Sequence, residues 1–169
     1  MIKTTSTHAF FYTEWPSNFC KTKFVWEQFN EKHEFFCTEQ AFMWAKAKHF
    51  GDFRSAQKIL NEKEDPMVCK MYGREVLYYE DAEWEKVRYS YMLLLNLERF
   101  RQDKVLQAKL LEPKFEGLTF VEASPWDKIW GVGMKQDDPL IVDPKNWKGR
   151  NLLGQVITEC RATIKNELN

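Results

Sequence analysis

The segment at residues 120–134 constrains the fold more than any other part of the sequence, since it holds two carboxylates, two tryptophans and two glycines. The residues at 118–121 favour a strand, and Ser-Pro-Trp-Asp at 124–127 has the capping box and first-position proline of a helix start. Gly131 and Gly133 follow within about one turn, and a capped helix of one turn gains little stability. We therefore predict a strand, a tight turn and a close backbone approach, which direct four side chains toward a pocket: Glu122, Trp126, Asp127 and Trp130.

The same segment resembles a family motif. Glu122-Ala-Ser-Pro-Trp-Asp127 followed by Trp130-Gly-Val-Gly133 is similar to the E-A-S-x-x-D-x-x-W-G-x-G block of the NADAR superfamily, the YbiA-like N-glycosidases that act on nucleotide-like substrates. The resemblance implies that Asp127 is catalytic. It also implies a set of substrate-binding residues in this segment: Glu122, Ser124, Trp126, Trp130 and Gly131.

Length and composition indicate one folded domain. The 169 residues suffice for a sizeable core, and the content of 44% hydrophobic and 15% aromatic residues argues against disorder. The 25 Lys and Arg residues balance 25 Asp and Glu residues, so any contact with nucleic acid would depend on a local basic patch.

Cysteine and histidine spacing does not indicate a metal site. Four scattered cysteines include no C-x-x-C pair, and three histidines lie outside metal-ligand spacing. We expect reduced thiols, no metal and no cofactor. With no basic segment leading into an apolar run and no apolar stretch of about 18 residues, a cytoplasmic protein without a membrane segment is expected.

The sequence of the N-terminal third predicts strands followed by a helix. A short strand at 10–12 and a turn at 15–19 are predicted, then a hairpin with strands at 24–29 and 34–37 around residues 30–32. The turn is similar to the family's P-S-N-F element, which implies that Asn18 and Phe19 face the ligand.

The next helix is predicted to begin with Thr38 as its cap and to end at Gly51. Glu39 and Lys46 lie on one face about two turns apart, too far for a direct ion pair. Both could simply complement the helix dipole. However, the segment 39–47 is similar to the family's E-H-x-F-x-x-x-K-A helix, which implies that Glu39 and Lys46 are catalytic. The sequence has Gln40 where many relatives have histidine.

Three further helices are predicted before the central segment. Asp52 caps a short helix to Leu60, and Asp65-Pro66 begins another that ends near Gly73. Residues 70–76 resemble the family's K-x-x-G-R-x-V element, which implies that Arg74 binds a phosphate or carboxylate, although an isolated arginine there is more often a surface cation. The longest helix, at 82–100 with Asp81 as its cap, is expected to bury Trp84, Val87, Tyr91, Leu94, Leu95 and Phe100.

The C-terminal part combines a helix at 103–111, an extended loop at 137–144 and a final helix that opens at 147–154. Lys148 and Arg150 precede that helix, where free backbone N–H groups would favour an anion. An exposed basic loop is the simpler interpretation for Lys148. The stretch resembles the family ending D-P-x-x-W-x-G-x-N-L-L-G, which implies that Arg150 and Asn151 bind substrate.

The resemblance runs from about residue 10 to residue 161 and implies a single α+β domain over residues 1–169, mostly helical with a small sheet. It implies cleavage of a ribose C1′–N bond, with ADP-ribosylated guanine in nucleic acid or nucleotides as the leading substrate. Hydrolysis of ribosylamino-pyrimidine phosphates of riboflavin synthesis and a non-catalytic nucleotide-binding module are the alternatives. Covalent attack by Lys46 and direct attack by water both remain open. No obligate protein partner is expected.

Overall fold

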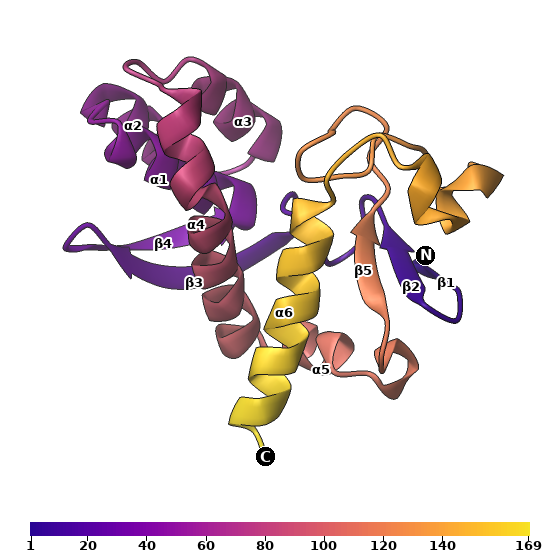
Figure 1. The fold of residues 1–169 in the computed structure, drawn as a ribbon. Coiled ribbons are helices and arrows are strands. Elements are labelled where there is room, and N and C mark those ends of the chain that lie inside the picture. The colour runs from indigo at the N-terminus through magenta and orange to yellow at the C-terminus, as the bar shows by residue number, and fades with distance from the viewer. The chain divides into compact units, whose positions relative to one another are not determined.

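The computed structural model describes residues 1–169 and divides into two compact units. One unit consists of residues 18–103, and the other combines residues 1–17 with residues 104–169. Helices dominate both units and small sheets accompany them (Figure 1), which confirms the predicted α+β class. None of the helices combines the length and the apolarity that crossing a membrane requires.

The unit at residues 18–103 begins with the predicted hairpin. Strand β3 (Lys21–Gln28) pairs antiparallel with β4 (Glu31–Cys37). Phe29 and Asn30 form the turn, with φ of 56° and 59°. Two consecutive residues at positive φ are typical of the tight turns that match the twist of a hairpin. The turn therefore comes one residue earlier than the predicted segment 30–32.

Four helices complete this unit: α1 (Thr38–His49), α2 (Phe53–Asn61), α3 (Pro66–Arg74) and α4 (Asp81–Gln102). Helix α1 packs against the other three helices and against the hairpin. Asp52 and Asp65 cap α2 and α3 as predicted. The predicted cap Thr38 is wrong, because Cys37 is the capping residue and its Sγ accepts a hydrogen bond from the Gln40 N–H. Cys37 still has the extended backbone of β4, so the strand leads directly into the helix.

Helix α4 buries Trp84, Leu95 and Phe100 as predicted, and Val87 and Tyr91 are partly buried. Glu80, and not Asp81, is its N-terminal flanking residue. Leu94 is 45% exposed, whereas the buried face includes two arginines and an asparagine, Arg88, Arg99 and Asn96. Because these buried residues are polar, the spacing of apolar residues does not reveal the whole buried face. The predicted burial of Leu94 is therefore wrong.

The second unit contains a three-stranded sheet in the order β1-β2-β5. Strand β1 (Lys3–Thr4) is antiparallel to β2 (His8–Phe11), and β2 is parallel to β5 (Thr119–Glu122). Helix α6 (Leu152–Glu167) packs on β5 (Figure 1), and α5 (Lys104–Leu110) and the 3₁₀ helix η1 (Pro113–Phe115) lead into β5. A Cβ on Gly154 would overlap the Phe120 carbonyl oxygen, so α6 can approach β5 this closely only with a glycine.

The predicted extended loop at 137–144 instead contains 3₁₀ helices, which corrects that prediction. They are η2 (Pro139–Val142) and η3 (Pro144–Asn146). Asp138 and Asp143 cap them and a proline occupies the first turn of each. An Asp-Pro pair combines a capping side chain with a preset φ, so the same chemistry that begins α3 begins these short turns.

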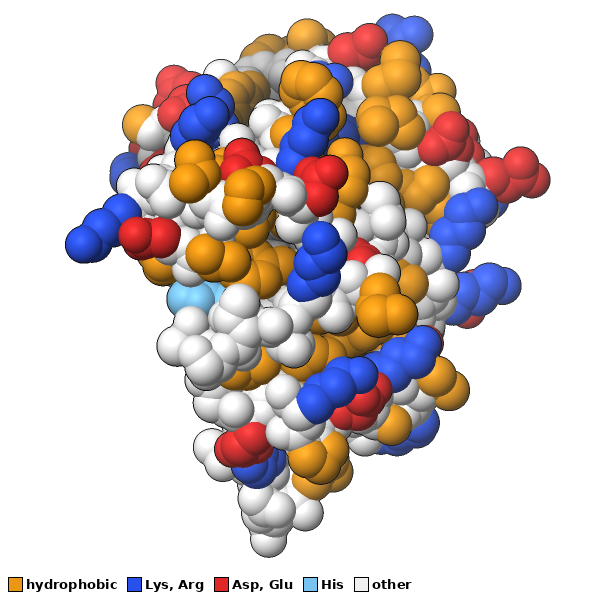
Figure 2. Space-filling view, turned by 90° about the vertical axis from the view of Figure 1, so that its right-hand side faces the viewer, with side chains coloured by type: hydrophobic (Ala, Val, Ile, Leu, Met, Phe, Trp, Pro, Cys, Tyr) orange, Lys and Arg blue, Asp and Glu red, His pale blue; other side chains and the backbone are white.

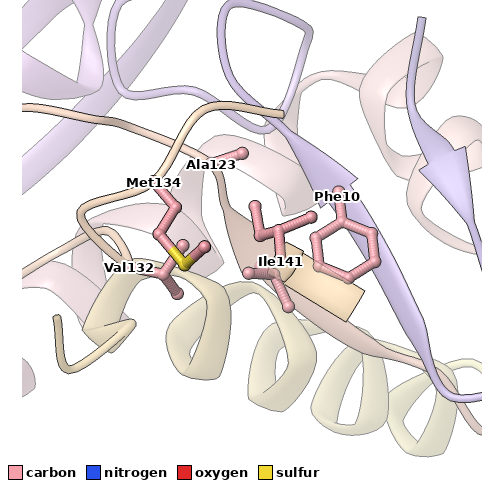
Figure 3. Packing of buried hydrophobic residues seen from close by; sticks show 6 residues of the cluster. Phe10, Ala123, Val132, Met134 and Ile141 are labelled. Carbon is pink, nitrogen blue, oxygen red and sulfur yellow. The ribbon is translucent and has the colours of Figure 1, made fainter. Parts of the chain in front are cut away.

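The core of this unit lies between the sheet and the segment that follows β5. Figure 3 shows Val132 and Met134 directed toward Ile141 and Phe10, so the chain folds back on itself after β5. Trp147 packs against the same cluster and its indole N–H donates to the Ile141 carbonyl at 2.8 Å. The segment at 123–134 is therefore anchored by burial as well as by hydrogen bonds.

Candidate active site

Lys46 lies in the last turn of α1 with its side chain partly buried. Its Nζ donates a hydrogen bond to the Gly73 carbonyl oxygen at 2.8 Å and lies 4.4 Å from the centre of the Tyr79 ring. A Cβ on Gly73 would overlap Sδ of Met43 in α1. Because Gly73 has no side chain, the end of α3 comes close enough to α1 for its carbonyl to hold the ammonium.

The net effect of burial and nearby charges is to lower the pKa of Lys46 from its ordinary value. Burial is the largest cause that lowers the pKa of Lys46, and the positive charge of Arg88 lowers it further. The charge of Glu39 opposes this effect. Weaker contributions come from two more charged residues, Arg74, which lowers the pKa, and Asp81, which raises it. A lowered pKa increases the neutral fraction of a lysine, which is the form that can act as a nucleophile.

Glu39 lies in the first turn of α1 and is buried. Its backbone N–H donates to the Asn18 carbonyl oxygen at 3.0 Å, which brings two predicted site residues together. Asn18 is 7% exposed, and its Oδ1 is buried without a hydrogen-bond partner. Buried side-chain oxygens nearly always accept a hydrogen bond. Asn18 Oδ1 is one of the few buried side-chain oxygens of this chain without such a donor.

Two other predicted residues lie in the same unit. The ring centre of Phe19 lies 5.7 Å from the Lys70 ammonium. Arg74 is exposed in the last turn of α3, where its charge complements the helix dipole and acts on Lys46.

Glu39 and Lys46 are seven residues apart, a rise of about 10 Å along α1. A substrate that reaches both must extend along this helix.

A chain of hydrogen bonds leads from the Tyr79 ring to a buried arginine. The Tyr79 hydroxyl donates to Asp81 Oδ1 at 2.7 Å, and Nη2 of Arg88 donates to the same oxygen at 3.0 Å. Nε of Arg88 lies 3.1 Å from Glu85 Oε2. The hydrogen bond from Tyr79 is the main cause that holds the pKa of Asp81 below its usual value. The ring beneath the Lys46 ammonium is thus fixed by an ion pair.

Tyr79, Asp81 and Arg88 belong to none of the sequence motifs described above. Asp81 was predicted only as a helix cap. Arg88 follows Trp84 by four residues and shares its buried face. An arginine at that spacing on a buried face is the one signal that could have identified this group.

Asp127 closes a turn after β5. Its Oδ1 accepts hydrogen bonds from the N–H groups of Ile129 and Trp130 at 2.9 and 2.7 Å. Its own N–H donates to Ser124 Oγ at 3.2 Å. No helix follows, so the capping-box residues stabilise a tight turn, as predicted. The carboxylate of Asp127 therefore orders the segment that carries Trp130.

The two glycines of this segment permit a close backbone approach. The Val132 N–H donates to the Glu122 carbonyl at 3.0 Å. A Cβ on Gly131 would lie 3.0 Å from the carbonyl oxygens of both Glu122 and Asp127. Gly133 has φ of 68°, a conformation that favours glycine. The predicted close approach is confirmed.

The backbone N–H groups at the start of α6 are not free, which corrects the predicted anion site. Those of residues 151–153 donate to the carbonyl oxygens of residues 129–131, each at 3.1 Å. The Arg150 N–H donates to the Lys128 carbonyl at 2.8 Å. An anion here would have to bind through side chains, and those of Lys148 and Arg150 are exposed.

Asn151 fixes the same loop against β5. It has φ of 56° and is buried. Its Oδ1 accepts from the Glu122 N–H and its Nδ2 donates to the Phe120 carbonyl, both at 2.9 Å. This amide therefore bonds to the edge of β5 as a neighbouring strand would.

Trp126 projects from the turn and is 84% exposed. It borders a surface pocket of about 450 Å³ that also includes Tyr12 and two cations, Lys3 and Lys135. Exposed tryptophan rings are suited to stacking on planar ligands. Trp130 is partly buried.

The predicted site residues form two groups, one in each unit. The unit at 18–103 holds Asn18, Phe19, Glu39, Lys46 and Arg74. The other unit holds the rest, at the end of β5, in the turn that follows it or just before α6: Glu122, Ser124, Trp126, Asp127, Trp130, Gly131, Arg150 and Asn151. No group of three or more His, Cys, Asp or Glu side chains is placed to hold a metal ion.

Two known proteins are similar to this chain in sequence. The chain is 36% identical to the protein irg-1 of Caenorhabditis elegans over 133 residues, which cover 78% of this chain and 61% of irg-1. It is 34% identical to N-glycosidase R617 of Acanthamoeba polyphaga mimivirus over 151 residues, which cover 89% of this chain and 85% of R617. The chain thus spans about three fifths of the length of irg-1.

A solved structure shares the fold. The NMR structure of the E. coli protein YbiA superposes with a TM-score of 0.72 at 24% identity, covering 98% of this chain and 89% of YbiA. The family model of the NADAR domain matches residues 3–165, a range that includes residues of both units. The chain therefore belongs to the NADAR domain family.

Proposed function

We propose that this chain is an N-glycosidase that cleaves the bond between ribose C1′ and a base nitrogen. The observation that carries the proposal is Lys46, a partly buried lysine held by the Gly73 carbonyl and the Tyr79 ring, with its pKa lowered by burial. A lysine that only complemented a helix dipole would not need these contacts. The name of the mimivirus relative, N-glycosidase R617, supports the same activity.

The reaction begins when the neutral Lys46 amine attacks C1′. The C1′–N bond breaks, its electron pair goes to the base nitrogen, and that nitrogen takes a proton from a carboxylic acid. Nζ then loses its proton, the ring oxygen O4′ leaves C1′ and is protonated, and a protonated Schiff base joins C1′ to Nζ. Water adds to C1′, the C1′–Nζ bond breaks, and the sugar leaves as an aldehyde that recloses to a ring.

Glu39 and Asp127 are the carboxyl groups proposed for proton transfer. The burial of Glu39 and its place on the same helix as Lys46 support its role. Asp127 also orders the turn that carries Trp130. The remaining proposed binding residues are of two kinds. Polar and stacking groups would bind the base and the sugar, and cations would bind phosphate: Asn18, Phe19, Glu122, Ser124, Trp126, Trp130, Gly131 and Asn151, with Arg74 and Arg150.

The proposed substrate is ADP-ribosylated guanine in a nucleotide or a nucleic acid. The exposed Trp126 ring supports this choice, because it is suited to stacking on a base. The face in Figure 2 interleaves cationic and acidic side chains and shows no continuous basic surface. Nucleic acid would therefore be recognised through a few local contacts, in keeping with the balanced charge of the chain.

Release of the base tests the proposal. The chain is incubated with an ADP-ribosylated guanine oligonucleotide, and separately with a ribosylamino-pyrimidine phosphate, and the products are followed by mass spectrometry. We expect release of ADP-ribose from the oligonucleotide. Release from the pyrimidine phosphate alone would assign the activity to riboflavin intermediates, and release from neither would indicate a nucleotide-binding module.

A further inference from the structure

Tyr78 lies in the turn after α3 with a left-handed backbone that is unusual for an aromatic residue. Phe29 and Tyr78 are the two aromatic residues at positive φ, with values of 56° and 62°. Bulky side chains rarely adopt this conformation, which Gly and Asn tolerate. The Phe29 ring packs against Trp44 and Tyr91, with ring centres 5.7 and 5.9 Å apart. Core packing therefore accounts for an aromatic residue at position 29.

The Tyr78 side chain has no such packing. It is 74% exposed, and it makes no ring contact, hydrogen bond or ion pair within the chain. An asparagine would fit the backbone better and expose less apolar surface to water. Residues with unusual backbone angles cluster at active sites and ligand-binding sites. Tyr78 gains no contact within the chain from its conformation.

The neighbours of Tyr78 hold it in this conformation from both sides. The Leu77 N–H donates to Asp52 Oδ2 at 2.9 Å, and Asp52 is buried as the cap of α2. On the other side, the Tyr79 hydroxyl is bonded to Asp81. Tyr78 is thus presented from a fixed backbone. A side chain positioned in advance loses little freedom when a ligand binds.

Tyr78 directly precedes Tyr79, whose ring contacts the Lys46 ammonium. The ring of the next residue, Tyr79, lies under the Lys46 ammonium at 4.4 Å, and consecutive Cα atoms are about 3.8 Å apart. We propose that Tyr78 is a substrate-binding residue whose ring stacks on a planar base of the nucleotide substrate. The inference rests on the proposed glycosidase function and deepens it, since it adds a residue that selects an aromatic base.

The test compares Tyr78→Asn and Tyr78→Phe with the unchanged chain. Steady-state kinetics on the ADP-ribosylated guanine oligonucleotide gives KM and kcat, calorimetry gives Kd for ADP-ribose and for GMP, and circular dichroism gives the melting temperature. Base stacking on an aromatic ring corresponds to about 5- to 150-fold in affinity. We expect Tyr78→Asn to raise KM, and Kd for at least one of the two ligands, by such a factor, with kcat retained. Its melting temperature should be equal or higher, because the strain is relieved.

Two variants serve as controls. Tyr78→Phe keeps the ring and should keep KM within about twofold, since stacking does not require the hydroxyl. Phe29→Asn makes the same change at the other strained aromatic position, and should lower the melting temperature while leaving KM unchanged, because that ring is packed in the core.

The outcomes separate this inference from the proposed function. Wild-type KM and Kd values in active Tyr78→Asn would overturn the role of Tyr78 and leave the glycosidase intact. That result would also be expected if the exposed ring served a protein partner. An unchanged chain that releases no base and binds neither ADP-ribose nor GMP would overturn the proposed function, and this inference with it.

Discussion

Gln40 occupies the position where many relatives have histidine, and the structure gives it a structural role. Its side chain is buried between three elements. Oε1 accepts from the Phe36 N–H at 3.0 Å, and Nε2 donates to the carbonyls of Ile59 and Glu62 at 2.9 and 2.7 Å. It therefore ties α1 to the end of β4 and to the last carbonyls of α2. We predict that Gln40→Ala lowers stability and spares the chemistry.

The magnitude follows from the three hydrogen bonds. Each contributes about 1 kcal/mol, and buried partners left unsatisfied add to the loss, so the free energy of unfolding should fall by about 3 kcal/mol. For a chain of this size, that lowers the melting temperature by about 6 to 12 °C. Neutral histidine offers one donor and one acceptor, so Gln40→His should keep two of the bonds and lose about 1 kcal/mol.

Thermal unfolding by circular dichroism and kcat measured well below the melting temperature test this prediction. Gln40→Ala, Gln40→His and the unchanged chain should rank in that order of rising stability, with similar kcat. If Gln40→Ala has the same melting temperature as the unchanged chain but loses turnover, position 40 takes part in the reaction and our reasoning is refuted.

Three further predictions concern the site residues. Asp127→Asn should abolish turnover with little change in melting temperature, because an amide oxygen can still accept both turn hydrogen bonds; a fall as large as that of a core truncation would make Asp127 purely structural. Arg74→Ala or Arg150→Ala should raise KM for a phosphorylated substrate about 10- to 150-fold more than for its dephosphorylated form, which corresponds to ~1.5–3 kcal/mol for a charged hydrogen bond. Equal effects on both substrates would exclude these arginines from phosphate binding. Arg88→Met removes a positive charge that lowers the pKa of Lys46, so the acid limb of kcat against pH should move to higher pH, and an unmoved limb would separate Arg88 from Lys46.

Local chemistry explains what the sequence could predict. The caps of α2 and α3 depend on hydrogen bonds that the Ser55 N–H donates to Asp52 and the Met67 N–H donates to Asp65, within three residues. The turn that Asp127 closes is equally local. Such features are encoded by neighbouring residues, so a single sequence reveals them.

Features that depend on distant partners were predicted less well. The parallel pairing of β2 with β5 joins His8 to Thr119, and no local pattern encodes it. The N–H groups of residues 151–153 were expected to be free because their partners, residues 129–131, lie about twenty positions earlier in the chain. The exposure of Leu94 was missed because a buried arginine, Arg88, takes a place on the core face of α4.

Part of the candidate site can be predicted from the sequence. Motif resemblance identified Glu39 and Lys46 on one helix, and helical spacing gave their common face. The contacts that make Lys46 unusual come from α3 and from the segment before α4, through Gly73 and Tyr79. Helical periodicity carries no information on such contacts, so the environment of Lys46 needed the structure.

Trapping of the Schiff base tests the central claim most directly. Sodium borohydride added during turnover reduces an iminium between C1′ and Nζ to a stable amine, which mass spectrometry of digested protein can locate. We predict an adduct carrying the sugar on the peptide that contains Lys46. Lys46→Arg keeps the charge but cannot readily form the Schiff base, so it should fold, remain inactive and trap nothing. Substantial activity in Lys46→Arg, or active enzyme that yields no adduct, would contradict the covalent mechanism.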